Sequence, residues 1–84
     1  MSAREMFEKL GYKKLPKKYN KNMILYEREE ENPCTYAKFK VIVWFELKGK
    51  RIQFSPYYRY TLEELQAINK QVEELGWNER WNKR

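Results

Sequence analysis

The sequence predicts an α+β fold: a short N-terminal helix, a three-stranded antiparallel β-meander and a longer C-terminal helix packed on one sheet face. Three observations lead to this prediction. Each end of the chain carries a helix-start signal followed by apolar residues at helical spacing. Both of these segments finish in Leu-Gly-aromatic. The sequence between them is rich in β-branched and aromatic residues that alternate with polar ones.

The first helix is expected over residues 3–10. Ser2 and Glu5 have the spacing of a capping box, in which each side chain bonds the backbone amide of the other. Gly11 and Tyr12 then predict a Schellman ending, in which glycine adopts a left-handed conformation and Tyr12 packs back on the helix. The apolar face of this helix comprises Met6, Phe7 and Leu10.

Three strands are expected in the middle of the chain, over residues 23–28, 35–47 and 51–55. The acidic run and the proline within 29–33 are expected to end the first strand. A tight turn at 48–50 joins the other two. A weaker strand pattern at Tyr12 to Leu15 is not counted. The lysine-rich segment 13–22, which overlaps this pattern and includes Lys13, Lys14, Lys17 and Lys18, is expected to be a loop.

The second helix is the clearest element. Thr61 and Glu64 form another capping box, and Gly76 with Trp77 repeats the Schellman ending. A single domain is expected over residues 1–77, followed by a basic tail over 78–84 that frays. The apolar stripe of the helix comprises Leu62, Leu65, Ile68, Val72 and Leu75. The expected core comprises Met6, Phe7, Leu10, Val41, Val43, Phe45, Ile52, Phe54, Leu65, Ile68, Val72 and Leu75.

Alternation along the strands separates two faces of the sheet. An apolar set should face the helices, and a mixed set of lysines, arginine and aromatic residues should face away from them. The helix-facing set comprises Phe39, Val41, Val43, Phe45, Leu47, Ile52 and Phe54. Because the second helix is acidic and the long strand is basic, we expect the face away from the helices to be positive.

The composition argues against most catalytic chemistry. The chain has no His, no Asp and one cysteine, Cys34. The usual zinc ligand sets and nucleophile-base pairs cannot be assembled from these residues, so we expect no metal, no cofactor and no enzymatic activity. The lone cysteine fits a reducing compartment, and no apolar run is long enough for a membrane span, so a cytoplasmic protein is expected.

The remaining function class is binding. The first hypothesis is protein-protein association with an unknown protein or a second copy, because exposed apolar residues often mark interfaces. The alternative is binding of single-stranded nucleic acid through stacking aromatic residues and lysines. A solvated basic face that only keeps the protein soluble is the third interpretation. The candidate binding residues are Tyr36, Lys38, Lys40, Ile42, Trp44, Arg51, Tyr57 and Tyr58.

A resemblance adds a setting to these hypotheses. The N-terminal REMFEKLGY and the ending TLEELQAINKQVEELGW, either side of a β-rich middle, resemble small uncharacterised proteins encoded in phages and prophages of Gram-positive bacteria. The resemblance covers residues 3–77 and is most specific over 61–77. It implies a small phage-type accessory protein and carries over no catalytic or binding residue.

Overall fold

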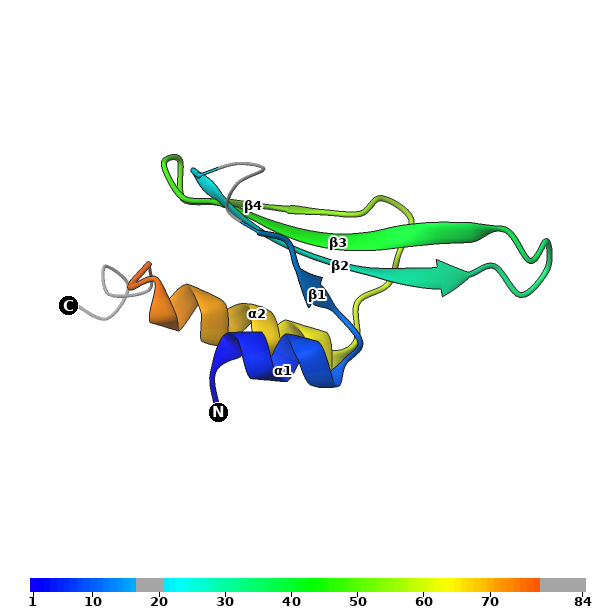
Figure 1. Ribbon diagram of the computed structural model, residues 1–84, viewed down its shortest axis with the longest axis horizontal. Coiled ribbons are helices and arrows are strands. Elements are labelled where there is room, and N and C mark those ends of the chain that lie inside the picture. Colours follow the sequence, from blue (N-terminus) through cyan, green and yellow to red (C-terminus); the bar gives the residue numbers. More distant parts are fainter. Residues whose placement is uncertain (17–20, 78–84) are drawn as a thin grey trace.

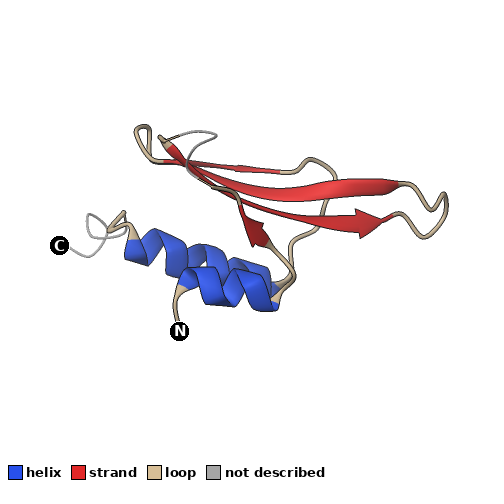
Figure 2. Cartoon of the chain, in the orientation of Figure 1, coloured by secondary structure: helices blue, strands red, loops and turns tan. Residues whose placement is uncertain are grey.

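The computed structural model describes residues 1–16 and 21–77 of the chain and has an α+β fold. A short strand, β1 (Lys13–Lys14), follows helix α1 (Ala3–Lys9). The chain continues through strands β2 (Met23–Glu31), β3 (Lys38–Glu46) and β4 (Arg51–Phe54) to helix α2 (Leu62–Glu74). The strands form one antiparallel sheet in the order β1-β2-β3-β4, and both helices lie on the same side of it (Figures 1 and 2).

The sheet has four strands, whereas the sequence predicted three. The additional strand is β1, in which Lys13 pairs with Glu27 and Lys14 with Tyr26. The amide of Leu15 extends this pairing by donating to the carbonyl of Leu25 at 2.9 Å. Backbone pairing therefore forms a strand where the side-chain pattern was weak. The predictions for Lys17, Lys18 and the tail at 78–84 fall outside the described residues.

Both helices begin and end as the sequence predicted. Ser2 and Glu5 form one capping box, and Thr61 and Glu64 form the other. At the end of α1, Gly11 has a φ of +90° and the amide of Tyr12 donates to the carbonyl of Phe7 at 3.0 Å. The end of α2 repeats this geometry, with Gly76 at a φ of +74°. The two Leu-Gly-aromatic segments are thus helix endings of the Schellman type.

Strand β2 is longer than predicted, because the acidic run at 29–31 does not end it. Glu29 and Glu31 lie opposite Lys40 and Lys38 of β3 in the antiparallel register. Opposite charges on facing strands compensate for the poor strand propensity of consecutive glutamates. The strand ends instead at Glu31, and the side-chain oxygen of the next residue, Asn32, accepts hydrogen bonds from the amides of Cys34 and Thr35 in the following turn.

The core is one cluster of buried residues that come from α1, β2, β3 and α2, together with Tyr12. Five of the predicted core residues are buried, and Met6, Leu10, Ile52, Val72 and Leu75 are partly buried against them. Two predictions are wrong, because Phe54 is 42% exposed and Leu65 is 48% exposed. The buried hydrophobic residues are Ala3, Phe7, Tyr12, Ile24, Tyr26, Val41, Val43, Phe45, Ala67 and Ile68.

The predicted apolar stripe of α2 is only partly buried. Leu62 is 64% exposed, whereas the polar residues Glu64 and Gln71 are 2% and 6% exposed. The helix is rotated from its hydrophobic pattern because these two side chains have partners in the interior. Gln71 accepts a hydrogen bond from the hydroxyl of Tyr26 at 2.8 Å, and Glu64 accepts several from neighbouring tyrosines. Polar groups that are hydrogen-bonded in the interior can be buried at little cost in free energy.

The hairpin of β2 and β3 extends past the ends of both helices (Figure 1). Phe39 lies on this extension, and its side chain belongs to the helix-facing set by alternation. It is nevertheless 43% exposed. Its exposure shows that a correct face assignment does not guarantee burial, because burial also requires a helix above the same stretch of strand.

Candidate functional site

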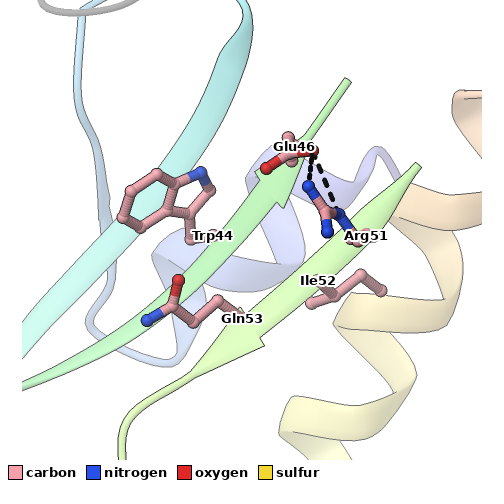
Figure 3. Close-up of a pocket in the computed structure, with 5 residues that line it drawn as sticks. All are labelled: Trp44, Glu46, Arg51, Ile52 and Gln53. Carbon is pink, nitrogen blue, oxygen red and sulfur yellow. Dashed lines mark hydrogen bonds and ion pairs between the residues drawn. The ribbon is translucent and has the colours of Figure 1, made fainter. Parts of the chain in front are cut away.

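The outer face of the sheet, the side away from the helices, gathers five of the eight predicted site residues. Strand alternation and ion-pair contacts place Lys38, Lys40, Ile42 and Trp44 on this face from β3, and Arg51 from β4. Figure 3 shows the part of the face around Trp44 and Arg51. The sequence therefore predicted the membership of this face well where regular strands carry it.

The centre of the outer face is apolar. Trp44 lies between Leu25 of β2 and Gln53 of β4 in the strand register. Its indole ring extends from β3 toward β2 (Figure 3). Trp44, Leu25 and Ile42 are each half-buried, because each is flanked by neighbouring strands but neither α1 nor α2 covers this side. The indole Nε1 is buried without a hydrogen-bond acceptor among the described residues. The three side chains form a small apolar centre on an open sheet.

A shallow hollow of about 320 Å³ adjoins Trp44 at the β4 side of the face. Glu46 and Arg51 form its charged wall, and the guanidinium donates from Nη2 to Oε1 of Glu46 at 2.8 Å (Figure 3). Ile52 and Gln53 complete the lining. The hollow thus combines an aromatic side chain, an amide and a neutralised ion pair. Its volume lies at the lower end of the range found for ligand pockets, which is roughly 300–1,000 Å³.

The outer face is not the positive surface that the sequence predicts. Nζ of Lys38 lies 3.7 Å from Oε1 of Glu29, and Nζ of Lys40 lies 3.7 Å from Oε1 of Glu27. Arg51 is paired with Glu46. The glutamates come from β2 and β3, whose alternation places them on the same face as the cations. The prediction considered the charge of each segment separately. It did not include the neutralisation of the lysines by glutamates, because cross-strand pairing determines which charges become neighbours.

The three tyrosines of the predicted site do not join this face. Tyr36 lies in the β2-β3 connection with a φ of +60° and is 74% exposed. Tyr57 has a φ of +63° and its side chain is fully exposed. Tyr58 turns to the helix side, where its hydroxyl donates to Glu64 at 2.9 Å. Tyr58 therefore lies at the start of α2 and not beside the five candidate binding residues of the outer face, since the left-handed residue before it redirects the chain.

The structure also contains a polar cluster that the sequence did not predict. It consists of Arg28 from β2, Tyr12, Tyr58 and Glu64, and is called the Arg28 cluster below. Nη2 of Arg28 lies 3.3 Å from the carboxylate of Glu64 and also donates to the hydroxyl of Tyr58. The guanidinium carbon lies 5.2 Å from the ring centroids of both Tyr12 and Tyr58. The cluster connects β2, the end of α1 and the start of α2.

A signal for this cluster was present in the sequence. Ile24 and Tyr26 alternate as helix-facing residues of β2, so the next residue on that face is Arg28. An arginine that continues an apolar alternation needs an internal carboxylate, because an unpaired buried charge is costly. Glu64 could have been suspected from its place in the capping box, where its carboxylate is held beside the Thr61 amide at 2.7 Å. The pairing itself joins residues far apart in the sequence.

The Arg28 cluster stabilises each member in its ordinary protonation state. Burial opposes ionisation of Glu64, but hydrogen bonds from Tyr12, Thr61 and Tyr58 outweigh it and hold the Glu64 pKa below its usual range. Burial, together with the nearby Glu64 carboxylate, raises the pKa of Tyr58 to about 12. The same two causes raise the pKa of Tyr12. These shifts move the pKa values of the three groups away from neutral pH, whereas an acid-base catalyst works best with a pKa near the pH at which it operates.

In comparisons with protein-family models, curated proteins and solved structures, the chain has no match. The described residues contain no group of three or more His, Cys, Asp or Glu side chains that could hold a metal ion. None of the helices in the described part of the chain has the length and apolar content to span a membrane.

Proposed function

We propose that the protein is a small binding module that associates with another protein through the outer face of its sheet. The observation that carries the proposal is an apolar centre surrounded by ion pairs. Leu25, Ile42 and Trp44 occupy this centre. The proposal requires that α2 packs on the opposite side of the sheet. The presence of Ala67 and Ile68 in the core cluster supports this arrangement.

The arrangement resembles the distribution of binding energy in many protein interfaces. A few aromatic and arginine side chains at the centre supply most of the free energy of binding, and surrounding polar groups exclude water. Trp44 would be the central residue, and the hollow beside it would receive an apolar side chain of the partner. Because the ion pairs at the rim offer both signs of charge, a partner with mixed charge fits better than a polyanion.

Nucleic-acid binding is the second candidate, and one observation still favours it. Lys21, Lys48 and Lys50 are exposed and form no ion pair within the described residues. The amide of Leu47 bonds the carbonyl of Asn22 at 2.9 Å, so these lysines lie at the same end of the sheet. Phosphate contacts could form there, but not around Trp44. The candidate nucleic-acid surface is therefore the end of the sheet.

The proposed setting follows from the resemblance to phage and prophage proteins of Gram-positive bacteria. We infer a cytoplasmic accessory protein that acts by binding and without catalysis. The absence of His and Asp from the sequence and the pKa shifts in the Arg28 cluster support this inference. In such a setting the partner would be a protein of the phage or of its host cell.

The decisive experiment compares three immobilised full-length chains for capture of proteins from bacterial lysate. They are the wild type, Trp44→Ala and the matched control Asn69→Ala, which removes an exposed side chain of α2. A protein captured by the wild type and the control but not by Trp44→Ala is then purified. Its dissociation constant for each chain is measured at about 50 and about 200 mM salt. Circular dichroism verifies that all three chains are folded.

We expect Trp44→Ala to weaken the purified complex about thirtyfold or more, corresponding to a binding hot spot of about 2 kcal/mol. Salt should change the wild-type affinity only slightly. Loss of binding in Asn69→Ala as well, or no Trp44-dependent protein at all, would refute the proposal. Labelled single-stranded oligonucleotides are titrated in parallel. Tight binding that falls steeply with salt and is abolished by Lys48→Glu would establish the second candidate instead.

A further inference from the structure

The open edge of β4 presents backbone groups in a definite pattern. The amide of Ile42 donates to Oγ of Ser55 at 2.8 Å, and its carbonyl accepts from the hydroxyl of Tyr60, so the peptide groups of Ile42 point toward β4. By strand alternation the peptide groups of Trp44 do the same and bond its register partner, Gln53. The N–H and C=O groups of Ile52 and Phe54 consequently point away from β3. No strand of the described chain pairs with them.

We propose that this edge binds a second copy of the chain, with β4 antiparallel to β4 around a two-fold axis at Gln53. In this register, Ile52 lies opposite Phe54 of the second copy, and Phe54 lies opposite Ile52 of the second copy. Each of these pairs exchanges two N–H···O=C hydrogen bonds, as hydrogen-bonded antiparallel pairs do. Gln53 meets Gln53 of the second copy on the axis. The inference rests on the β4 edge and holds whether or not the outer face has another partner.

The side chains of the edge match themselves in this register. Ile52 and Phe54 belong to the helix-facing side of the sheet, where Ile52 is half-buried and Phe54 is 42% exposed. Each would pack on the other in the second copy, as apolar cross-strand pairs do. The partly exposed ring of Phe54, which already contacts Tyr60 at a centroid distance of 5.2 Å, would then be covered. On the outer face two glutamine amides would face each other and can hydrogen-bond.

The distribution of charge favours this register over others. Arg51 would lie opposite Ser55 of the second copy, which keeps the two Arg51 side chains roughly 14 Å apart at about 3.4 Å per residue. Each Arg51 also remains paired with its own Glu46 at 2.8 Å. A parallel pairing would instead bring the two arginines close together. The net charge of each copy is +6, so salt should strengthen the dimer by screening their mutual repulsion.

The pairing would end at two copies. Strand β4 has four residues, and Pro56, which has no amide hydrogen, follows soon after it. The opposite edge of the sheet consists of β1, which has two residues, and of the part of β2 that β1 does not cover, where the charged run 28–31 disfavours further strand addition. Because the hollow beside Trp44 reaches Ile52 and Gln53 at the β4 edge, the two hollows would adjoin across the axis. The dimer would therefore present one continuous outer face with residues from both copies.

A charge-exchange experiment tests the interface. Sedimentation equilibrium measures dimerisation of the full-length wild type and of the variants Gln53→Lys and Gln53→Glu. The matched control is Gln66→Lys, which changes an exposed residue of α2. Like charges opposite each other on the axis should weaken the dimerisation of each Gln53 variant about fivefold. An equimolar mixture of Gln53→Lys and Gln53→Glu should recover the wild-type affinity or exceed it. Misfolding of a variant could not produce this recovery.

A cross-linking experiment tests the register. In a Cys34→Ser background, Gln53→Cys should form an intermolecular disulfide under mild oxidation. The two Cα atoms at a non-hydrogen-bonded pair lie about 4.5 Å apart, which a disulfide spans. Arg51→Cys, on the same face of the same strand, should not cross-link. A wild-type chain that remains monomeric at about 1 mM, failure of the mixture to recover, or preferential cross-linking of Arg51→Cys would overturn the proposal. These results do not depend on the Trp44→Ala binding experiment, because that experiment tests the outer face and not the β4 edge.

Discussion

Individual residues in this protein are placed by their hydrogen-bond partners as much as by their hydrophobicity. Glu64 is the clearest case, since its side chain is 3% exposed and receives hydrogen bonds from Tyr12 and Tyr58 and an ion pair from Arg28. It also caps α2 through the amide of Thr61. Removal of this single carboxylate would leave two phenols without their acceptor, and Arg28 would keep only its ion pair with Glu30.

We predict that Glu64→Ala lowers the free energy of unfolding by about 3–5 kcal/mol, the usual cost of breaking a buried ion pair by removing one partner. Glu63→Ala is the matched control, because Glu63 occupies the same first turn but is exposed. It should cost less than about 1 kcal/mol, through the helix dipole alone. Urea denaturation at neutral pH measures both. Similar losses in the two variants would contradict the structural role assigned to the Arg28 cluster.

At the scale of elements, the ends of the helices depend on backbone conformation. Gly11 has a φ of +90°, and a Cβ built there would lie 3.9 Å from Cδ of Arg28, which is ordinary contact. Space is therefore available at this position, and the conformation alone requires glycine. The same turn leads directly into β1 and brings Tyr12 against Phe7, with ring centroids 5.3 Å apart.

We predict that Gly11→Ala destabilises the protein by about 1–2 kcal/mol, the cost of holding a residue with a Cβ in the left-handed region. Lys9→Ala, at the exposed last position of α1, should change stability by less than about 0.5 kcal/mol. Thermal or urea unfolding distinguishes the two. If Gly11→Ala behaved like Lys9→Ala, the left-handed helix ending would not be the reason for glycine at this position.

At the scale of the whole molecule, buried phenols link stability to alkaline pH. Burial, with a smaller contribution from Glu74, raises the pKa of Tyr26 to about 12, and burial with Glu64 does the same for Tyr58. A folded-state pKa above the unfolded value means that the protonated phenol is favoured by the native state. Its contribution to stability is complete below the unfolded pKa of about 10 and is lost as pH rises through the folded pKa.

We therefore predict that the free energy of unfolding is insensitive to these tyrosines up to about pH 9 and declines between about pH 10 and pH 12. Tyr58→Phe should make the decline shallower, whereas Tyr57→Phe, at a fully exposed site, should leave it unchanged. Urea denaturation at a series of pH values measures the slope. An identical slope in wild type and Tyr58→Phe would show that this phenol does not contribute.

The sequence by itself determined the local features of the protein. Capping boxes, Schellman endings and β-branched alternation depend on residues a few positions apart, so the α+β class and most strand and helix limits could be predicted from them. The same alternation identified Lys38, Lys40, Ile42, Trp44 and Arg51 as residues of one face.

Only the tertiary structure decided which distant residues meet. The rotation of α2 toward Glu64, the pairing of Lys38 and Lys40 with glutamates of β2, and the exposure of Phe39 beyond the helices all follow from contacts between separate elements. A propensity or a periodicity measures the preference of one segment, whereas a buried arginine or a neutralised lysine depends on what another segment places beside it. For that reason the strands could be predicted, but the charge of their outer face could not.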